Sequence, residues 1–299
     1  MSAIRLATRR SPLAQLQARY VQERLRSLSI ESELVLVQTR GDANTSASLT
    51  SLGGQGIFAV EVQRSVLCGD ADVAVHSAKD LPSTTPEGLT LACVPERRDP
   101  FDVLVGRSLA GLGPGATVAT GSPRRRALLL ERRPDLNIVG LRGNMASRLA
   151  AAGRDGVDAV VAAAAALDRL GQVSLAAERL DASWFVPQVG QGALALEIRE
   201  NDAQSAEALL GLNNHDAFRA LASERSFLRE LGAGCSVPAG AFATSEDGEL
   251  HLSGLMIAYD GSRSVRLAVR GHDPETLGRE LARRLRDDLG GGSLPGWRD

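Results

Sequence analysis

The sequence predicts two similar α/β domains followed by a smaller α+β domain, and three observations support this fold class. Strand and helix patterns alternate over the first two thirds of the 299 residues, which is typical of largely parallel sheets. One strand-loop-helix pattern occurs twice. The last stretch departs from this order, because two consecutive strand patterns precede a helix.

The first domain begins with a strand at residues 3–8 and a helix at residues 11–28. Ser11 is placed to cap this helix, with Pro12 as its first residue. Apolar side chains at helical spacing are Leu13, Leu16, Tyr20, Leu25 and Leu28. Further patterns predict a strand at 32–39, a helix at 56–69 and a strand at 71–77.

The second domain repeats the first pattern. The segment "ATVATGSPRRRALLLERRPDL" again runs from an apolar strand into a helix, capped by Ser122 and begun by Pro123. A second similarity joins "GDADVAVHSAKDL" to "DGVDAVVAAAAALDRL", where Asp72 and Asp158 each open a short apolar strand. Both similarities occur in the same order, which indicates two domains of one design. Chance similarity between strand-loop-helix units is the alternative.

The C-terminal stretch predicts a third unit of a different kind. "ELHLSGLMIAY" and "SVRLAVRG" have the pattern of antiparallel strands, and "ETLGRELARRLRDDL" follows as a helix. The expected domain boundaries are 1–95 with 193–210 for the first domain, 101–187 for the second and 214–299 for the third.

Composition excludes several classes of protein. The net charge is −2, the pI is about 6.1 and aromatic residues make up 3%, which argues against a nucleic-acid binder. We find no apolar run long enough to span a membrane and no signal-peptide core at the N-terminus, so we expect a cytoplasmic protein without a membrane partner. Three cysteines without C-x-x-C spacing and four scattered histidines suggest neither disulfides nor a metal site.

Arginines gather where strands are expected to lead into capped helices. Such junctions present unpaired backbone N–H groups and a positive helix end, which suits anions. The polar residues at these loops are Arg9, Ser11, Ser122, Arg124, Arg125, Arg142 and Arg148. Guanidinium groups bind carboxylates and phosphates through two parallel hydrogen bonds. The pattern favours a polyanion site between the two domains, whereas for any single arginine a solvated surface charge is an equal alternative.

Lys79 is the only lysine in the chain, since the other 33 of the 34 basic residues are arginine. It stands beside Asp80 after an expected strand, where an ammonium and a carboxylate could serve proton transfer or balance a cationic intermediate. An exposed pair before Pro82 is the simpler alternative. Cys235 lies in the small-residue loop "LGAGCSVPAG" without a local base, whereas Cys68 and Cys93 end apolar runs and are expected in the core.

Taken together and in order, the motifs resemble the porphobilinogen deaminase (hydroxymethylbilane synthase) family. They are "IRLATRRSPLAQLQA", "TRGD", "LGGQGIFAVEV", "ADVAVHSAKDLP", "TGSPRRRALL", "LRGNMASRL", "PQVGQGALALE" and "ERSFLRELGAGCSVPAGAFA". The resemblance implies two periplasmic-binding-protein-like α/β domains around a cleft plus a smaller C-terminal α+β domain. It also implies a cytoplasmic, monomeric enzyme of porphyrin and heme biosynthesis. This transferase would condense four porphobilinogen molecules head to tail, release ammonia and form the linear hydroxymethylbilane.

The resemblance assigns roles to individual positions. Cys235 matches the cysteine that carries the family's dipyrromethane cofactor through a thioether. Asp80 matches the catalytic aspartate, which stabilises positive charge as ammonia leaves and the azafulvene forms, and which also contacts the cofactor. Positions matching cofactor contacts are Ser77, Lys79, Ser122, Arg124 and Arg125. Positions matching contacts to substrate side chains are Arg9, Ser11, Arg142, Arg148, Arg169 and Phe58. Each porphobilinogen brings an acetate and a propionate, so the growing chain is a polyanion.

Some positions depart from the family pattern. Ser51 and Gln55 stand where the family often has lysines, and Ala166 and Ala233 stand where glycine is usual. These departures leave open a paralogue with altered turnover. A non-catalytic, two-lobed solute-binding module is the alternative from another class, and the placement of Cys235 and Asp80 argues against it.

Overall fold

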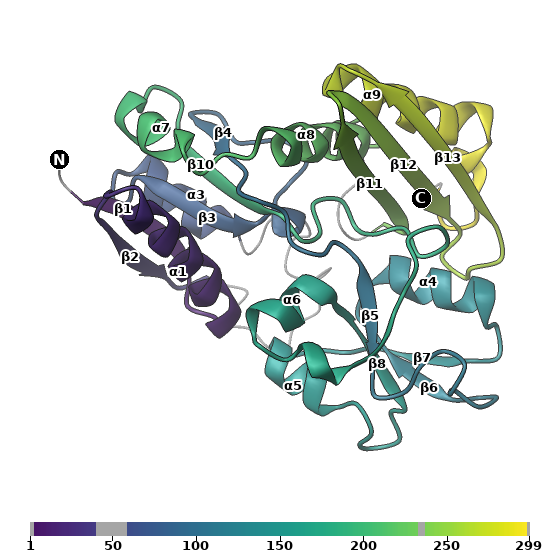
Figure 1. The fold of residues 1–299 in the computed structure, drawn as a ribbon. Coiled ribbons are helices and arrows are strands. Elements are labelled where there is room, and N and C mark those ends of the chain that lie inside the picture. Colours follow the sequence, from purple (N-terminus) through teal and green to yellow (C-terminus); the bar gives the residue numbers. More distant parts are fainter. Residues whose placement is uncertain (1–2, 40–58, 233–236, 298–299) are drawn as a thin grey trace.

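The computed structural model describes residues 3–39, 59–232 and 237–297, and three β-sheets organise them (Figure 1). The first sheet contains β1 (Ile4–Arg9), β2 (Ser32–Val37), β3 (Val73–Ser77), β4 (Leu89–Cys93) and β10 (Leu194–Arg199). The second contains β5 (Asp102–Val105), β6 (Thr117–Ala119), β7 (Asn137–Val139), β8 (Ala159–Ala163) and β9 (Ala176–Arg179). The third contains β11 (Ala239–Glu246), β12 (Glu249–Ile257) and β13 (Ser264–Gly271).

Helices connect and cover these sheets. The α-helices are α1 (Pro12–Ser27), α3 (Val60–Leu67), α4 (Pro123–Arg132), α5 (Met145–Ala150), α6 (Ala164–Arg169), α7 (Ala203–Leu210), α8 (His215–Glu230) and α9 (Pro274–Arg283). Shorter turns are η1 (Ala78–Asp80), η2 (Val173–Leu175), η3 (Arg284–Asp288) and η4 (Gly291–Ser293). Within the described ranges, no helix is long and apolar enough to cross a membrane.

The first two sheets share one topology, which confirms the predicted repeat. Their strand orders, β2-β1-β3-β10-β4 and β7-β6-β8-β5-β9, correspond strand by strand. In each sheet, three parallel strands lie side by side, and one antiparallel strand, β10 or β5, lies next to them. The chain enters this antiparallel strand after it has crossed from the other sheet. The predicted largely parallel sheets are therefore present, each with one antiparallel member.

Local contacts repeat as well. Ser11 caps α1 by accepting a hydrogen bond from the Ala14 N–H, and Ser122 caps α4 in the same way from the Arg125 N–H. A proline begins both helices. Asp72 and Asp158 each accept a hydrogen bond from a backbone N–H of the neighbouring strand at 2.9 Å. The two sequence similarities thus mark equivalent positions.

Two expectations about burial were wrong. The buried face of α1 is formed by Ala14, Gln17, Ala18, Val21 and Leu25. Leu16 and Leu28 are exposed instead, because the face toward the sheet lies one residue away from the predicted stripe. Cys68 is exposed, because it caps the C-terminal end of α3 after the buried stretch of that helix, whereas Cys93 is buried as expected.

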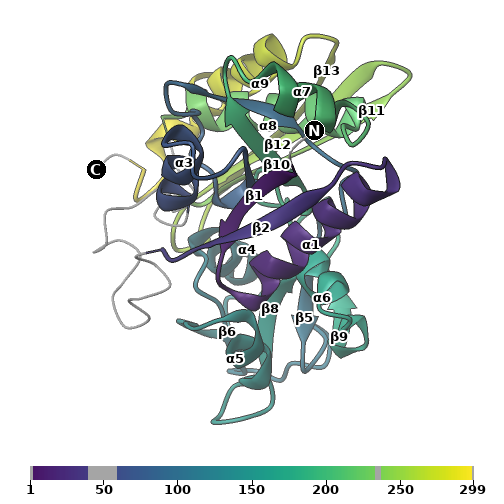
Figure 2. The same ribbon diagram turned by 90° about the vertical axis from the view of Figure 1, so that its left-hand side faces the viewer.

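The third sheet confirms the predicted α+β unit, with β11, β12 and β13 antiparallel in sequence order. Figures 1 and 2 show α8 and α9 beside this sheet. Leu255 and Ile257 of β12 belong to the same buried cluster as Leu128 and Phe185 of the second domain. The C-terminal unit is therefore joined to the second domain by apolar packing.

Two segments connect the first two sheets, and both bind one buried carboxylate. The first connection is residues 94–101, between β4 and β5, and the second is residues 180–193, between β9 and β10. Glu224 on α8 is fully buried and accepts hydrogen bonds from Arg97, in the first connection, and from the backbone N–H of Gly190, in the second. A third hydrogen bond comes from the backbone N–H of Ala243 in β11. All three parts of the chain therefore meet at Glu224.

Candidate active site

The predicted site residues lie mainly where strands of the two repeated sheets end. Arg9 and Ser77 are the last residues of β1 and β3, which run parallel. Lys79 and Asp80 follow in the turn η1. Because parallel strands end at the same edge of a sheet, these residues share one edge of the first sheet. Ser122 occupies the equivalent edge of the second sheet, between β6 and α4.

Ser77 is positioned by a buried glutamine. Gln17 on α1 is 4% exposed, and its Nε2 donates a hydrogen bond of 2.7 Å to the Ser77 hydroxyl. This bond uses a lone pair of the hydroxyl and leaves its proton available to an acceptor. Ser77 can therefore donate to an anion, as the resemblance implies.

Arg124 and Arg125 are held by one buried carboxylate. Asp102, the first residue of β5, is fully buried and lies 2.7 Å from Arg124 Nη2 and 2.6 Å from Arg125 Nη2. Burial alone would raise the pKa of Asp102, but the charges of Arg125 and Arg124 outweigh it and lower the pKa to about 2. This carboxylate is consequently ionised at neutral pH and fixes both guanidinium groups.

The guanidinium groups of Arg124 and Arg125 differ in how accessible they are to a ligand. Arg124 is 2% exposed, and it also donates to the carbonyl of Val186. Arg125 is less buried and also donates to the carbonyl of Val161. The predicted contact between Arg125 and an anionic cofactor is therefore compatible with its position, whereas Arg124 acts in this structure mainly on Asp102.

Lys79 is half-buried among these charges, which argues against the simple exposed pair. Burial and the nearby charge of Arg125 lower the pKa of Lys79 to about 8, although Asp80 and Asp102 oppose this effect. Its Nζ donates a hydrogen bond of 3.3 Å to Oε1 of Gln191. Lys79 is thus a cation near neutral pH that loses its proton in mildly alkaline solution.

Arg148 on α5 joins the same group of charges. Burial lowers the pKa of Arg148, the charge of Arg125 lowers it further, and Asp80 opposes the shift. Its Nε is buried without a hydrogen-bond partner among the described residues. An unsatisfied buried N–H of this kind is costly and suits an anionic ligand.

The remaining predicted arginines occupy separate positions. Arg169, at the end of α6, donates a hydrogen bond of 2.9 Å to the carbonyl of Gly192 in the second connection. Burial lowers the pKa of Arg169 to about 10. Arg142 lies in the loop before α5. Arg169 therefore binds the connection between the two sheets, and not the cluster of Lys79, Asp80, Arg125 and Arg148.

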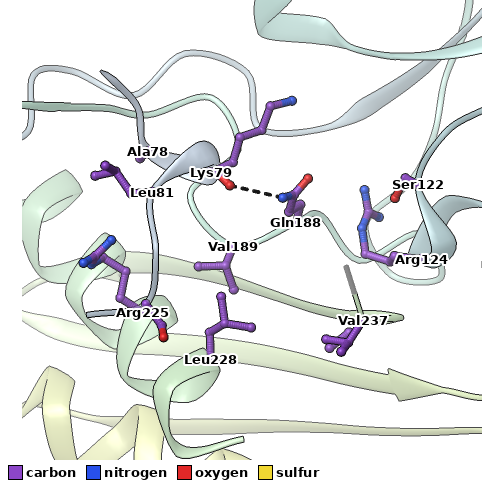
Figure 3. Close-up of a pocket in the computed structure, with 12 residues that line it drawn as sticks. Ala78, Lys79, Leu81, Ser122, Arg124, Gln188, Val189, Arg225, Leu228 and Val237 are labelled. Atoms are coloured by element: carbon purple, nitrogen blue, oxygen red, sulfur yellow. Dashed lines mark hydrogen bonds between the residues drawn. The ribbon is translucent and has the colours of Figure 1, made fainter. Parts of the chain in front are cut away.

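A cavity extends from the Lys79 turn to the C-terminal unit (Figure 3). Its lining includes Ser122 and Arg124 of the second domain, and Arg225 and Val237 of the third. In Figure 3 the Lys79 side chain points away from the cavity, while its backbone carbonyl accepts a hydrogen bond from Gln188. Val237 follows Cys235 by two residues, so the chain reaches this cavity directly after the predicted attachment cysteine.

Some predicted positions cannot be placed. Cys235 and Phe58 lie outside the described residues, as do Ser51, Gln55 and Ala233. Sequence reasoning also missed Asp102 and Gln191, which organise the charged groups. The motif "PQVGQGALALE" contains Gln191, and its two glycines around a polar residue were a signal for a closely packed polar contact.

The donor set fits an anionic organic cofactor. Three cationic side chains, Lys79, Arg125 and Arg148, interact electrostatically with one another or with Asp80. The hydroxyls of Ser77 and Ser122 lie at the adjoining strand ends. These groups match ligand carboxylates in charge and hydrogen-bonding type. Among residues 3–39, 59–232 and 237–297, no cluster of His, Cys, Asp and Glu is arranged to hold a metal ion.

Fold and site together define a protein with two similar α/β domains and a cluster of cationic and hydroxyl side chains at their strand ends. Comparison with known proteins makes this specific. The porphobilinogen deaminase "dipyromethane cofactor binding domain" matches residues 4–207, and the C-terminal domain of that family matches residues 218–287. The chain belongs to the porphobilinogen deaminase family.

Curated relatives agree with this assignment over nearly the full length. Porphobilinogen deaminase of Pelobacter propionicus is 43% identical over 288 residues, covering 94% of this chain and 93% of the relative. The Thermus thermophilus enzyme is 43% identical over 291 residues, covering 95% of each chain. Among solved structures, a periplasmic substrate-binding protein from Coxiella burnetii aligns with 74% of this chain and 96% of its own, with 16% identity and a TM-score of 0.43.

Proposed function

We propose that this chain is a porphobilinogen deaminase, a transferase that joins four porphobilinogen molecules head to tail. Each addition forms a carbon–carbon bond between two pyrroles and releases the side-chain amine as ammonia. The final product is the linear hydroxymethylbilane. The observation that carries this proposal is the group of Lys79, Asp80, Arg125 and Arg148 at the strand ends, in a chain of this family.

Within this proposal, Asp80 is the catalytic residue. It is the carboxylate that interacts with both Lys79 and Arg148. A carboxylate in a partly desolvated site stabilises positive charge that develops on a pyrrole nitrogen as an amine leaves. Asp80 would also hold pyrrole N–H groups in place, because its oxygens accept hydrogen bonds and do not donate them when ionised.

Lys79, Arg125 and Arg148 would hold acidic side chains of the ligand, together with the hydroxyls of Ser77 and Ser122. A dipyrromethane on Cys235 would supply the free pyrrole position to which the first substrate is joined. We propose cofactor contacts also for Arg124, and substrate contacts for Arg9, Ser11, Phe58, Arg142 and Arg169. The hydrogen bond of Arg169 to Gly192 adds a role at the connection between domains.

We further propose the domain boundaries 1–95 with 193–210, 101–187 and 214–299. The pairing of β10 with β3 and β4 supports the return of the chain to the first domain. A cytoplasmic location and a monomeric state remain predictions from the family resemblance.

The direct test is the stoichiometry of the reaction. Purified protein given porphobilinogen should release four molecules of ammonia for each linear tetrapyrrole formed. Binding of porphobilinogen without ammonia release would instead identify a solute-binding module. Both products are measured in the same samples, by enzymatic ammonia assay and by absorbance after cyclisation and oxidation to uroporphyrin.

Asp80→Asn tests the catalytic assignment. The amide keeps the size of the side chain but removes its negative charge, so we expect turnover to fall by roughly a thousandfold or more. The covalent adduct should remain, which intact mass measures. Turnover at the wild-type rate would remove Asp80 from its role.

A further inference from the structure

Gln191 lies between the charged groups of the two domains, and its function is not part of the proposal above. It is fully buried in the second connection between the sheets. Its backbone is fixed on both sides, because the N–H donates to the carbonyl of Gln188 and the carbonyl accepts from Arg97 Nε at 2.9 Å. The side-chain amide is therefore presented from a rigid segment.

The amide group makes opposite contacts at its two ends. Nε2 donates to the carbonyl of Pro100 at 2.8 Å and to Oδ1 of Asp102 at 3.0 Å. Oε1 accepts from Nζ of Lys79 at 3.3 Å and from Nη2 of Arg125 at 3.5 Å. Turning the amide over would place its oxygen against a carboxylate and its NH₂ against two cations. The surroundings therefore fix one orientation.

The glycines on either side of Gln191 allow its backbone to pack closely against two neighbouring segments. Gly190 has a φ of +72°, and a Cβ there would lie 2.9 Å from the carbonyl carbon of Ala78. Gly192 has a φ of +87°, and a Cβ there would overlap the carbonyl oxygen of Arg98. The backbone thus passes directly against the Lys79 turn on one side and the first connection on the other.

We propose that Gln191 is a positioning residue that holds the Lys79 ammonium in its charged form and aims it alongside Arg125. Lys79 is contributed by the first domain, and Asp102 and Arg125 by the second, so the amide links the cations of both domains. One neutral amide does this without adding charge, since it donates to the carboxylate and accepts from the ammonium. This inference rests on the proposed function, in which Lys79 and Arg125 hold ligand carboxylates.

The effect on Lys79 depends on all the charges around it. Burial disfavours the ammonium most, Arg125 and Arg124 disfavour it further, and Asp80 and Asp102 favour it. Gln191 supplies an uncharged acceptor on the same side as Arg125. Without this acceptor the ammonium loses a hydrogen bond that favours its charged form, so Lys79 should release its proton at lower pH.

The single lysine makes this measurable without reference to activity. Protein grown with [6-¹³C]lysine, in a tag-free form, carries one labelled side chain, and the ¹³Cε chemical shift follows the titration of Lys79 alone. The wild-type midpoint, measured with the covalent adduct in place, is the reference for the variants. Gln191→Met keeps the length of the side chain and removes its polar atoms. Its midpoint should move to lower pH by roughly one unit.

Two further variants make the outcome decisive. Gln191→Asn keeps the amide but shortens the side chain by one methylene, so the amide no longer spans from Asp102 to the Lys79 ammonium, and the midpoint should also move to lower pH than in the wild type. Gln188→Met is the matched control, because Gln188 donates to the backbone carbonyl of Lys79 rather than accepting from its ammonium (Figure 3). Its midpoint should stay at the wild-type value. Intact mass confirms that the compared samples carry the same covalent adduct.

Unchanged midpoints in both Gln191 variants would overturn the proposal. If Gln191→Met does not fold, Gln191→Asn alone decides, since a midpoint at or above the wild-type value contradicts the proposed contact. A wild type that releases ammonia from porphobilinogen while the midpoints stay fixed would refute only this inference. A wild type without ammonia release would refute the proposed function, whatever the titrations show.

Discussion

Asp102 shows at the scale of a single residue how the fold prepares the site. It is the first residue of an antiparallel strand, and it binds Arg124 and Arg125, two arginines that the sequence predicts as anion ligands. A buried carboxylate between two guanidinium groups keeps both in fixed directions, which free surface arginines lack. The proposed anion site therefore depends on a residue that does not need to touch the ligand.

Asp102→Asn should lower the free energy of unfolding by about 3–5 kcal/mol at pH 7, because two buried cations lose their counter-charge. Asp135→Asn is the matched control, since Asp135 pairs with Arg133 at a more exposed position, and its cost should be far smaller because solvent screens the pair. Urea denaturation of both variants and the wild type measures the difference. Equal costs would contradict the central role of Asp102.

The lowered pKa of Asp102 also predicts that the free energy of unfolding depends on pH. The pKa of Asp102 is about 2 in the folded protein, below its ordinary value of 3.8. Its stabilising contribution is therefore fully present above pH 4 and is lost as the pH falls from about 4 to about 2. The difference in unfolding free energy between wild type and Asp102→Asn should shrink over that range. A constant difference would show that Asp102 does not titrate as described.

Lys79 provides a second test at this scale. Lys79→Arg places a larger, planar group against Gln191 and Arg125, and it removes the ability to lose a proton in mildly alkaline solution. We expect kcat/KM at pH 7 to fall by roughly tenfold or more. If Lys79→Arg carried the normal adduct and had a normal kcat/KM, the site would not require a lysine at this position. Arg284→Lys, an exposed position paired with Glu280, controls for the exchange itself.

At the scale of elements, local signals were sufficient for the helix starts. Ser11 and Ser122 cap their helices as predicted, because capping involves residues within three positions along the chain. The buried face of α1 was not predicted, since it depends on how the helix lies on its sheet. Asp102 and Gln191 were missed for the same reason, because 89 residues of chain separate this hydrogen-bonded pair.

Gly190 links element packing to the site. Gly190→Ala would force a Cβ against the backbone of Ala78 and Lys79, at 2.9–3.0 Å. We expect the Lys79–Asp80 turn to shift and turnover to fall by roughly a hundredfold. Gly171→Ala is matched for backbone strain, with a φ of +65° but open space around the added carbon. Gly171→Ala should lower the free energy of unfolding by only about 1 kcal/mol and leave turnover unchanged. Equal effects of the two variants on turnover would contradict the close-approach argument.

In the whole molecule, two domains of the same topology are linked by two connections, and both connections bind the C-terminal unit. Strand order was not predictable in full, because β5 and β10 each enter a sheet after the chain has crossed from the other domain. Glu224 binds both connections and β11 together. The groups that would hold a growing polyanion are thus supplied by separate domains whose arrangement is set at a common junction.

The central claim, that this chain builds its product on a covalent two-pyrrole group at Cys235, is tested most directly by intact mass spectrometry. Protein from a host that makes porphobilinogen should be heavier than its sequence by a dipyrromethane. The Cys235→Ser variant, purified in the same way, should have the mass of its sequence alone. An unmodified and inactive wild type, or an adduct that persists in Cys235→Ser, would contradict the account.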